Sequence, residues 1–104
     1  MEIIWSSLAI DNWEVAARYI ANEFGKSVLQ NFLTDSLSWQ QQLIANPHIG
    51  HVEPLLKKRV RTYYSLVVNK RNKVIYYLEE DKIYIADFWD TRREPKSQII
   101  EIKD

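Results

Sequence analysis

The amino-acid sequence predicts an α+β fold in which an antiparallel β-sheet carries an α-helical hairpin on one face, in the order strand, helix, helix, strand, strand, strand. Residues 8–45 hold apolar side chains at three- and four-residue spacing and are interrupted only at Gly25. From residue 60 onward the apolar period becomes two, and short polar segments separate the apolar runs. With 104 residues, 46% of them hydrophobic, residues 1–104 suit a single domain with one core.

The chain should begin with a strand and a helix. Residues 1–5 are short and largely apolar, which indicates a strand, and Ser6 or Ser7 suits the N-cap of the next element. The helix should span residues 8–24, because its apolar side chains recur on one stripe. Gly25 should end it in the left-handed αL conformation, which glycine adopts most readily.

A second helix should follow at once and end before Asn46-Pro47. Because only Gly25 and its neighbours separate the two patterned segments, the helices should form an antiparallel hairpin. Trp13 and Trp39 fall in the apolar stripes of the two helices, so both should lie in the core rather than in a site.

Three strands are predicted in the second half of the chain. Their apolar alternation should place one set of side chains against the helices and the other set on the opposite face. The last two strands should form a hairpin. The segments are, in order, a connector (47–54), a helical turn (55–59), a strand (60–68), a polar loop (69–72), a strand (73–78), an acidic turn (79–81) and a strand (82–89).

The last strand and the tail depart from regular alternation. Phe88 lies three residues beyond Ile85, so the apolar phase slips, and we predict a β-bulge near Ala86-Asp87. The tail from residue 97 holds three isoleucines, which could add an edge strand or serve as a partner-binding strip.

Composition limits the classes of function. The net charge is zero, but residues 1–52 carry two basic and five acidic side chains, and residues 53–104 carry 12 and nine. The C-terminal half is therefore expected to face anions. The chain has no cysteine, which excludes disulfides and thiolate metal sites. His48 and His51 flank a glycine in a loop, so we expect no metal and no cofactor, and we expect neither a signal peptide nor a membrane span.

The sheet face away from the helices should be open. The alternation places on it Arg61, Tyr63, Ser65, Lys73 and Tyr77. Arg92 and Arg93 follow the last strand, where paired guanidinium groups can hold a phosphate or a carboxylate bidentately. Basic groups interleaved with aromatic rings are used to bind nucleic acid or an acidic partner. The alternative is that both arginines form surface salt bridges with Asp90, Glu94 or Asp87.

Several motifs taken together resemble a known family. They are, in order, Ile4-Trp5-Ser6, Ala9, Trp13 with Tyr19-Ile20, Asn46-Pro47-His48-Ile49-Gly50, Lys73-Val74-Ile75-Tyr76-Tyr77, Ile83-Tyr84-Ile85 and Phe88-Trp89-Asp90-Thr91-Arg92-Arg93-Glu94-Pro95. Over nearly its whole length the chain resembles the RelE/ParE superfamily of bacterial toxins from type II toxin–antitoxin modules, often labelled plasmid stabilisation proteins. The resemblance implies a RelE/ParE-like fold of the kind predicted above, a cytoplasmic location and a cognate antitoxin as partner.

One branch of that superfamily is enzymatic. RelE-like members cut messenger RNA on the ribosome: a base takes the proton of a ribose 2′-hydroxyl, the oxygen attacks the adjacent phosphate, and cations stabilise the charge that develops. If the chain resembles this branch, Lys73, Arg92 and Arg93 would stabilise the scissile phosphate, and Asp90 or Glu53 would act as the base.

The other branch acts by protein contact. ParE-like members are known as poisons of DNA gyrase. Asp90 stands where many of the nucleases carry His or Tyr, and beside two arginines it should stay ionised and be a poor general acid. Lys73 stands where the nucleases usually carry arginine. The resemblance therefore favours a ParE-like toxin with no catalytic residues and with DNA gyrase as its target. A ribosome-dependent ribonuclease acting on messenger RNA, or an inactive relative retained as a binding module, is the alternative. The residues expected to contact the target are Arg61, Tyr63, Lys73, Tyr77, Trp89, Arg92 and Arg93.

Overall fold

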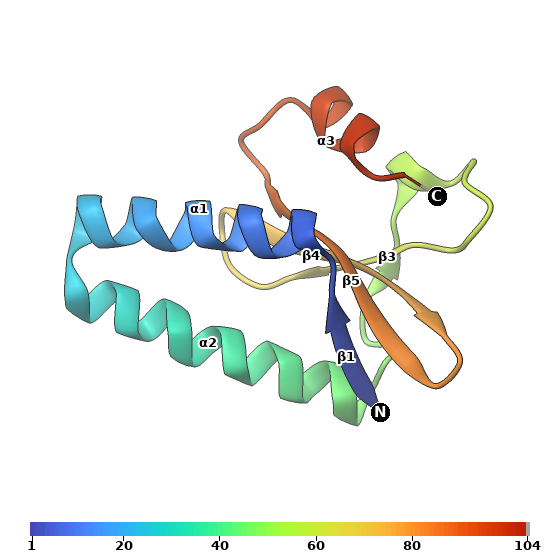
Figure 1. Ribbon diagram of the computed structural model, residues 1–104, viewed down its shortest axis with the longest axis horizontal. Coiled ribbons are helices and arrows are strands. Elements are labelled where there is room, and N and C mark those ends of the chain that lie inside the picture. Colours follow the sequence, from blue (N-terminus) through green and yellow to red (C-terminus); the bar gives the residue numbers. More distant parts are fainter. Residues whose placement is uncertain (104) are drawn as a thin grey trace.

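The computed structural model describes residues 1–103 and contains one five-stranded sheet with helices on both faces (Figure 1). The hairpin of α1 and α2 packs on one face, and α3 lies against the other. The elements are β1 (Glu2–Trp5), α1 (Ser7–Phe24), α2 (Lys26–Ala45), β2 (His51–Val52), the 3-10 turn η1 (Pro54–Leu56), β3 (Tyr64–Val67), β4 (Asn72–Glu79), β5 (Lys82–Asp90) and α3 (Pro95–Glu101). The predicted α+β architecture with a helical hairpin on one face is confirmed.

The sheet is mixed, with strand order β1-β5-β4-β3-β2. The strands β3, β4 and β5 pair antiparallel, as predicted. The short β2 lies within the predicted connector and pairs antiparallel with β3, whereas β1 joins β5 in parallel. The pairing continues beyond β1, since the Ser6 amide donates to the Ile85 carbonyl at 2.9 Å and the Ser6 hydroxyl donates to the Ala86 carbonyl at 2.8 Å. Ser6 thereby fixes both the end of β1 and the start of α1.

The two helices form as the sequence indicates. The Ser6 hydroxyl caps α1 by accepting from the Ala9 amide at 3.0 Å. Gly25 alone separates α1 from α2, but its φ of +85° and ψ of −176° differ from the predicted αL conformation. This extended, positive-φ region is available to glycine almost alone, and it turns the chain back in a single residue.

A hydrogen bond between side chains joins the two helices. The indole Nε1 of Trp13 donates to the Ser36 hydroxyl at 2.9 Å, and that hydroxyl donates to the Phe32 carbonyl. Ser36 is buried, and its small side chain leaves room for the ring. Trp39 is 5% exposed, and Trp13 packs against the same cluster, so the predicted core positions of both tryptophans are confirmed.

The β4–β5 hairpin contains the predicted bulge. Ile75 pairs with Asp87 and Tyr76 pairs with Ile85, which leaves Ala86 without a partner in β4. The extra residue shifts the phase of β5, so that Phe88 faces the helices like Ile85. At its other end the hairpin closes through Glu80 and Asp81, whose φ angles of 51° and 66° correspond to a two-residue type I′ turn.

Three predicted elements are wrong in extent or type. The strand expected at residues 60–68 is only β3, because the chain before it runs as a loop in which Val60 is 97% exposed. The turn expected at residues 55–59 is the shorter η1. The tail forms α3 instead of an edge strand, because Pro95 suits the first turn of a helix.

The sheet face predicted to be open is partly covered. A second apolar cluster forms there between η1, α3 and the sheet, and its buried members are Leu56, Tyr63, Ile75, Trp89 and Ile102. The Arg59 guanidinium holds the end of α3 by donating to the carbonyls of Ile99 and Ile102. Tyr63 and Trp89 are therefore 2% and 1% exposed and belong to a core, which corrects their predicted place on a target-binding surface.

Candidate functional site

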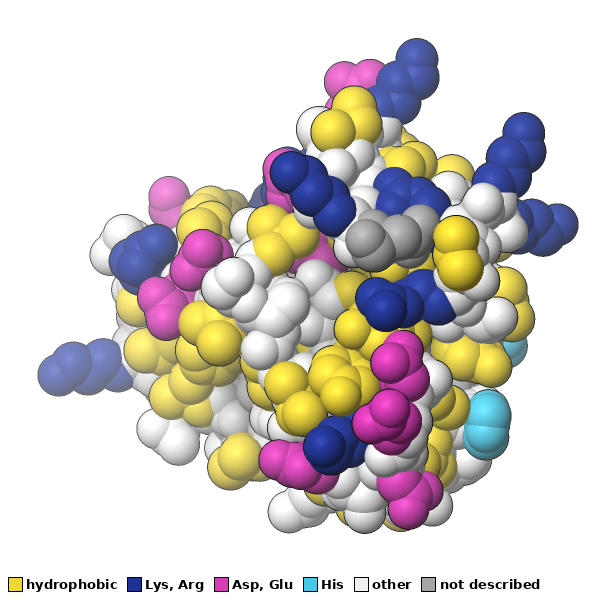
Figure 2. All heavy atoms as spheres, turned by 45° about the vertical axis from the view of Figure 1, so that its right-hand side comes forward, with side chains coloured by type: hydrophobic (Ala, Val, Ile, Leu, Met, Phe, Trp, Pro, Cys, Tyr) yellow, Lys and Arg dark blue, Asp and Glu magenta, His cyan; other side chains and the backbone are white. Residues whose placement is uncertain are grey.

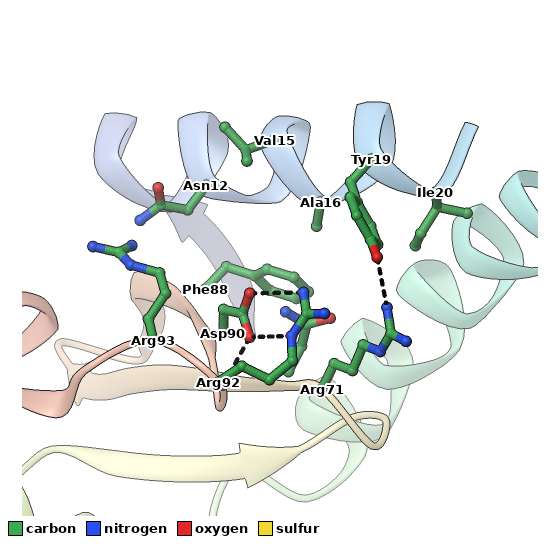
Figure 3. A pocket seen from close by; sticks show the side chains of 11 residues that line it. Asn12, Val15, Ala16, Tyr19, Ile20, Arg71, Phe88, Asp90, Arg92 and Arg93 are labelled. Atoms are coloured by element: carbon green, nitrogen blue, oxygen red, sulfur yellow. Dashed lines mark hydrogen bonds and ion pairs between the residues drawn. The ribbon is translucent and has the colours of Figure 1, made fainter. Parts of the chain in front are cut away.

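A cleft of about 170 Å³ lies between α1 and the ends of β4 and β5 (Figure 3). It brings together residues from three separate parts of the sequence. The lining residues are Asn12, Val15, Ala16, Tyr19, Ile20, Arg71, Asn72, Phe88, Asp90, Arg92 and Arg93. Three arginines and one carboxylate line it, so the cleft carries a positive formal charge.

Arg92 and Arg93 lie in this cleft, and each has an acidic partner. The Arg92 guanidinium donates to both oxygens of Asp90 at 3.1 Å, and the Arg92 amide donates to the same carboxylate at 2.9 Å. Arg93 pairs with Glu101 of α3 at 2.9 Å. The salt-bridge alternative for the two arginines is thus realised, with Glu101 in place of the acids expected for Arg93.

Asp90 is held in its ionised form. Partial burial by itself would raise its pKa, but the hydrogen bonds from Arg92 and the charges of Arg92 and Arg93 outweigh that effect and hold the pKa below its usual value. A carboxylate of this kind does not donate a proton at neutral pH.

Tyr19 projects from α1 between two guanidinium groups. The Arg92 and Arg71 guanidinium carbons lie 5.4 and 5.7 Å from the centre of its ring, and Arg71 also donates to its hydroxyl at 3.4 Å (Figure 3). The hydrogen bonds to Arg92 and Arg71 lower the pKa of the Tyr19 hydroxyl. The two guanidinium groups thus place positive charge on both sides of the Tyr19 ring.

The opposite end of the cleft is fixed by a buried carboxylate. Asn12 donates through Nδ2 to Asp87 Oδ1 at 2.7 Å, and Asp87 also accepts from the Phe88 amide and from Trp89 Nε1. Burial raises the pKa of Asp87 in spite of these three hydrogen bonds. Asp87 therefore orients Asn12 and ties α1 to the bulged strand.

Lys73 and Glu53 lie on the other face of the sheet. Lys73 pairs in register with Trp89, whereas its neighbour Asn72 pairs with Asp90. Lys73 forms an ion pair with the buried Glu53, and its ammonium lies 5.0 Å from the centre of the Trp89 ring. The residues that a ribonuclease would need are thus divided between two faces of the sheet.

Arg61 and Tyr77 form part of a stacked group on the sheet surface. The rings of Tyr77 and Tyr84 are 4.9 Å apart and nearly parallel, and the Arg61 guanidinium carbon lies 4.2 Å above Tyr77. A guanidinium nitrogen of Arg61 also lies 3.6 Å from a carboxylate oxygen of Glu79. In Figure 2 several Lys and Arg side chains gather in the upper right, and a row of acidic side chains runs below them. Both charges thus lie close together on this face of the molecule, whereas three of the four charged residues that line the cleft are arginines.

Some residues of the cleft carry no signal in the sequence that assigns them to a site. Tyr19 is one aromatic position in a long helix, and Arg71 is one polar position in a loop. Tyr19 and Arg71 are 52 residues apart along the chain, and they meet only because α1 packs beside β5. Asp87 could have been found, since an acidic residue at a predicted bulge in an apolar strand is unusual.

Residues 1–103 contain neither a candidate metal site nor a candidate membrane-spanning helix. No group of three or more His, Asp or Glu side chains is arranged to hold a metal ion there. His48 instead packs edge-on against the ring of Tyr64, 5.9 Å away. Within the same residues no helix has the length and apolar character needed to span a membrane.

Similar proteins exist at the levels of family and fold. The family model described as the ParE toxin of the type II toxin–antitoxin system, parDE, matches residues 3–95. Among curated proteins none matches the chain. A chain from the chromosomal ParDE TA system of P. aeruginosa is 13% identical, with a TM-score of 0.68 over 86% of this chain and 95% of that chain. The YoeB dimer of Staphylococcus aureus is 22% identical, with a TM-score of 0.54 over 84% of this chain and 92% of that chain. At these identities the two structures establish a shared fold.

Proposed function

Because this chain belongs to the family of ParE toxins of type II toxin–antitoxin systems, we propose that it is the toxin of such a module and acts by binding a protein target. DNA gyrase is the target proposed from the family resemblance, and a cognate antitoxin is the proposed neutralising partner. Action on gyrase places the protein in the bacterial cytoplasm.

The state of the charged side chains carries this proposal. Each group that a ribonuclease mechanism would use is engaged elsewhere: Lys73 with Glu53, and Arg92 with Asp90. Arg93 is paired with Glu101. Stabilisation of a phosphorane requires cations that are free to meet the new charge, and each of these three cations already has a carboxylate partner.

Acid–base chemistry is equally unsupported by the geometry. Glu53 is 1% exposed, and its second oxygen accepts from the Leu55 amide at 3.0 Å, so the carboxylate is fixed as the cap of η1. Asp90 is ionised and bound to Arg92. Neither side chain is placed to exchange a proton with a ribose hydroxyl. Action through protein contact requires no such groups, which favours the gyrase-binding proposal.

Two assays run in parallel test the proposal. Purified protein is added to a translating extract, in which the ends of the messenger RNA are mapped, and to a DNA gyrase supercoiling reaction. We expect inhibited supercoiling and intact messenger RNA. Messenger cleavage that disappears in Lys73→Ala and Arg92→Ala would refute the proposal and assign a ribonuclease.

A growth test separates a toxin from an inactive relative. Expression of the chain should arrest growth, and coexpression of the small reading frame encoded beside it should restore growth. Harmless expression of a folded chain without that partner would contradict the toxin assignment. The circular dichroism spectrum of the purified protein provides the control for folding.

A further inference from the structure

The charge of the cleft is not balanced among residues 1–103. Arg92 and Arg93 have carboxylate partners, but within this range no carboxylate lies within salt-bridge distance of Arg71. The Arg71 guanidinium donates to the Tyr19 hydroxyl, and its central carbon lies 5.7 Å from the ring centres of Tyr19 and Phe24. Most of its donors therefore remain available to an anion.

Several of the other residues that line the cleft are apolar. Phe88 and Ala16 belong to the core or pack against it, as does Ile20, so the part of the cleft beneath the arginines is not a polar surface. Val15 is 55% exposed on the α1 side. A cavity of about 150 Å³ holds a benzene molecule, so a cleft of about 170 Å³ takes one large apolar side chain.

We propose that this cleft binds a segment of a partner protein that places one carboxylate beside one large apolar side chain. The apolar side chain fills the space over Phe88 and Ala16, and the carboxylate accepts from the guanidinium of Arg71. Asn12, held by Asp87, offers its remaining amide groups to the backbone of the segment at the other end of the cleft (Figure 3).

The same observations disfavour a phosphate chain as the occupant. A nucleic-acid backbone presents regularly spaced phosphates and no apolar side chain, whereas this cleft has an apolar interior and carries the carboxylate of Asp90 among its lining residues. This inference rests on the proposed function only in that the partner is a protein. It adds that the partner must present a carboxylate beside a large apolar side chain.

A peptide titration tests the inference. The ¹⁵N-labelled protein is titrated with an acetylated, amidated hexapeptide that has one Asp next to one Leu among Ser and Gly. We expect shifts at the side-chain amide of Asn12 and at the Arg71 Nε. Binding should weaken about tenfold when Asn replaces the Asp, because a charge-assisted hydrogen bond is lost. A similar loss is expected when Ala replaces the Leu.

Protein variants locate the site. Arg71→Gln should weaken binding of the Asp-Leu peptide about tenfold. Val15→Asp should abolish binding, because it places at the cleft a carboxylate that repels the carboxylate of the peptide. Both positions are exposed, so both variants should fold. The matched control is Arg18→Gln, since Arg18 is an exposed arginine on α1 that pairs with Glu14 and does not line the cleft.

Three outcomes would overturn the inference. One is the absence of shifts at the cleft up to the solubility limit of the peptide. The second is equal binding of the three peptides, which would mean that neither the carboxylate nor the Leu side chain is recognised. The third is binding of inorganic phosphate or a short oligonucleotide at the same residues as tightly as the Asp-Leu peptide, which would assign a general anion site. The titration contains no gyrase, ribosome or antitoxin. Its failure therefore leaves the proposed toxin function standing, and failure of the gyrase assay leaves this inference standing.

Discussion

The ion pair between Lys73 and Glu53 provides a quantitative test of the second core. Glu53 is 1% exposed, whereas the Lys73 side chain is 22% exposed. Replacing Lys73 by Met keeps its apolar stem but leaves a buried carboxylate without its cation. Breaking a buried pair in this way costs about 3–5 kcal/mol. Because the exposed side of Lys73 admits water to the orphaned carboxylate, we expect a loss of about 2–3 kcal/mol.

Substitution of the other member of the pair should lower the free energy of unfolding by less. Glu53→Gln keeps an oxygen that accepts from the Leu55 amide, and the ammonium left behind can reach water. We therefore expect a loss of about 1 kcal/mol. The double variant should show a favourable coupling of about 1–2 kcal/mol between the two groups.

Urea unfolding followed by tryptophan fluorescence measures these free energies at neutral pH. A 104-residue domain has enough stability for each variant to remain folded without denaturant. A cost of Lys73→Met no greater than that of Glu53→Gln, or a double-mutant cycle without coupling, would refute the prediction. Either result would mean that the carboxylate is solvated in the native protein.

Three further predictions concern other parts of the fold. Gly50→Ala should lower the free energy of unfolding by about 2 kcal/mol in a thermal melt, since an added Cβ would lie 2.6 Å from a carbonyl oxygen of β3; an unchanged melting temperature would contradict this. Asp90→Asn should cost at most about 1 kcal/mol at neutral pH because Arg92 is exposed. The folded-state pKa of Asp90 is lowered, so its contribution is full above the ordinary aspartate pKa and disappears as the pH falls through the lowered value. The variant and the parent should thus converge in urea melts at acid pH, and a constant difference would refute the linkage. Ile102→Ala should cost about 2 kcal/mol by releasing α3, whereas Ile100→Ala, at a position 73% exposed, should be neutral; equal effects in chemical denaturation would mean that α3 does not cover the sheet.

Local patterns accounted for much of the fold. The two helices were predictable because their apolar stripes are long and a single glycine divides them. The bulge was predictable because the spacing of Ile85 and Phe88 breaks a strict alternation. The helix α3 was not, because seven residues with three nearby isoleucines do not distinguish a helix from a strand. The burial of Tyr63 depends on that missed helix, so it could not be predicted either.

The candidate site was predictable only where its residues are neighbours in the sequence. Asp90, Arg92 and Arg93 are neighbours in sequence, and their mutual pairing follows from that proximity. The cleft itself depends on Tyr19 and Arg71, which are brought together by the packing of α1 beside β5. In the ribonuclease alternative Lys73 and Asp90 would act together, but alternation and register place them on opposite faces. Pairing register across strands is a tertiary property that a single strand's pattern does not contain.

The parallel pairing of β1 with β5 has a consequence for how the sheet opens. β4 and β5 are joined by a two-residue turn, whereas Ser6 and Ala86, which meet where β1 ends, are 80 residues apart. Closing the longer loop costs about 3 kcal/mol more chain entropy, and β1 has only four residues and one neighbouring strand to offset it. Amide protons of β1 should therefore exchange with solvent well before those of β4. A protein fused to the N-terminus would be attached to β1, the strand that separates from the sheet most readily.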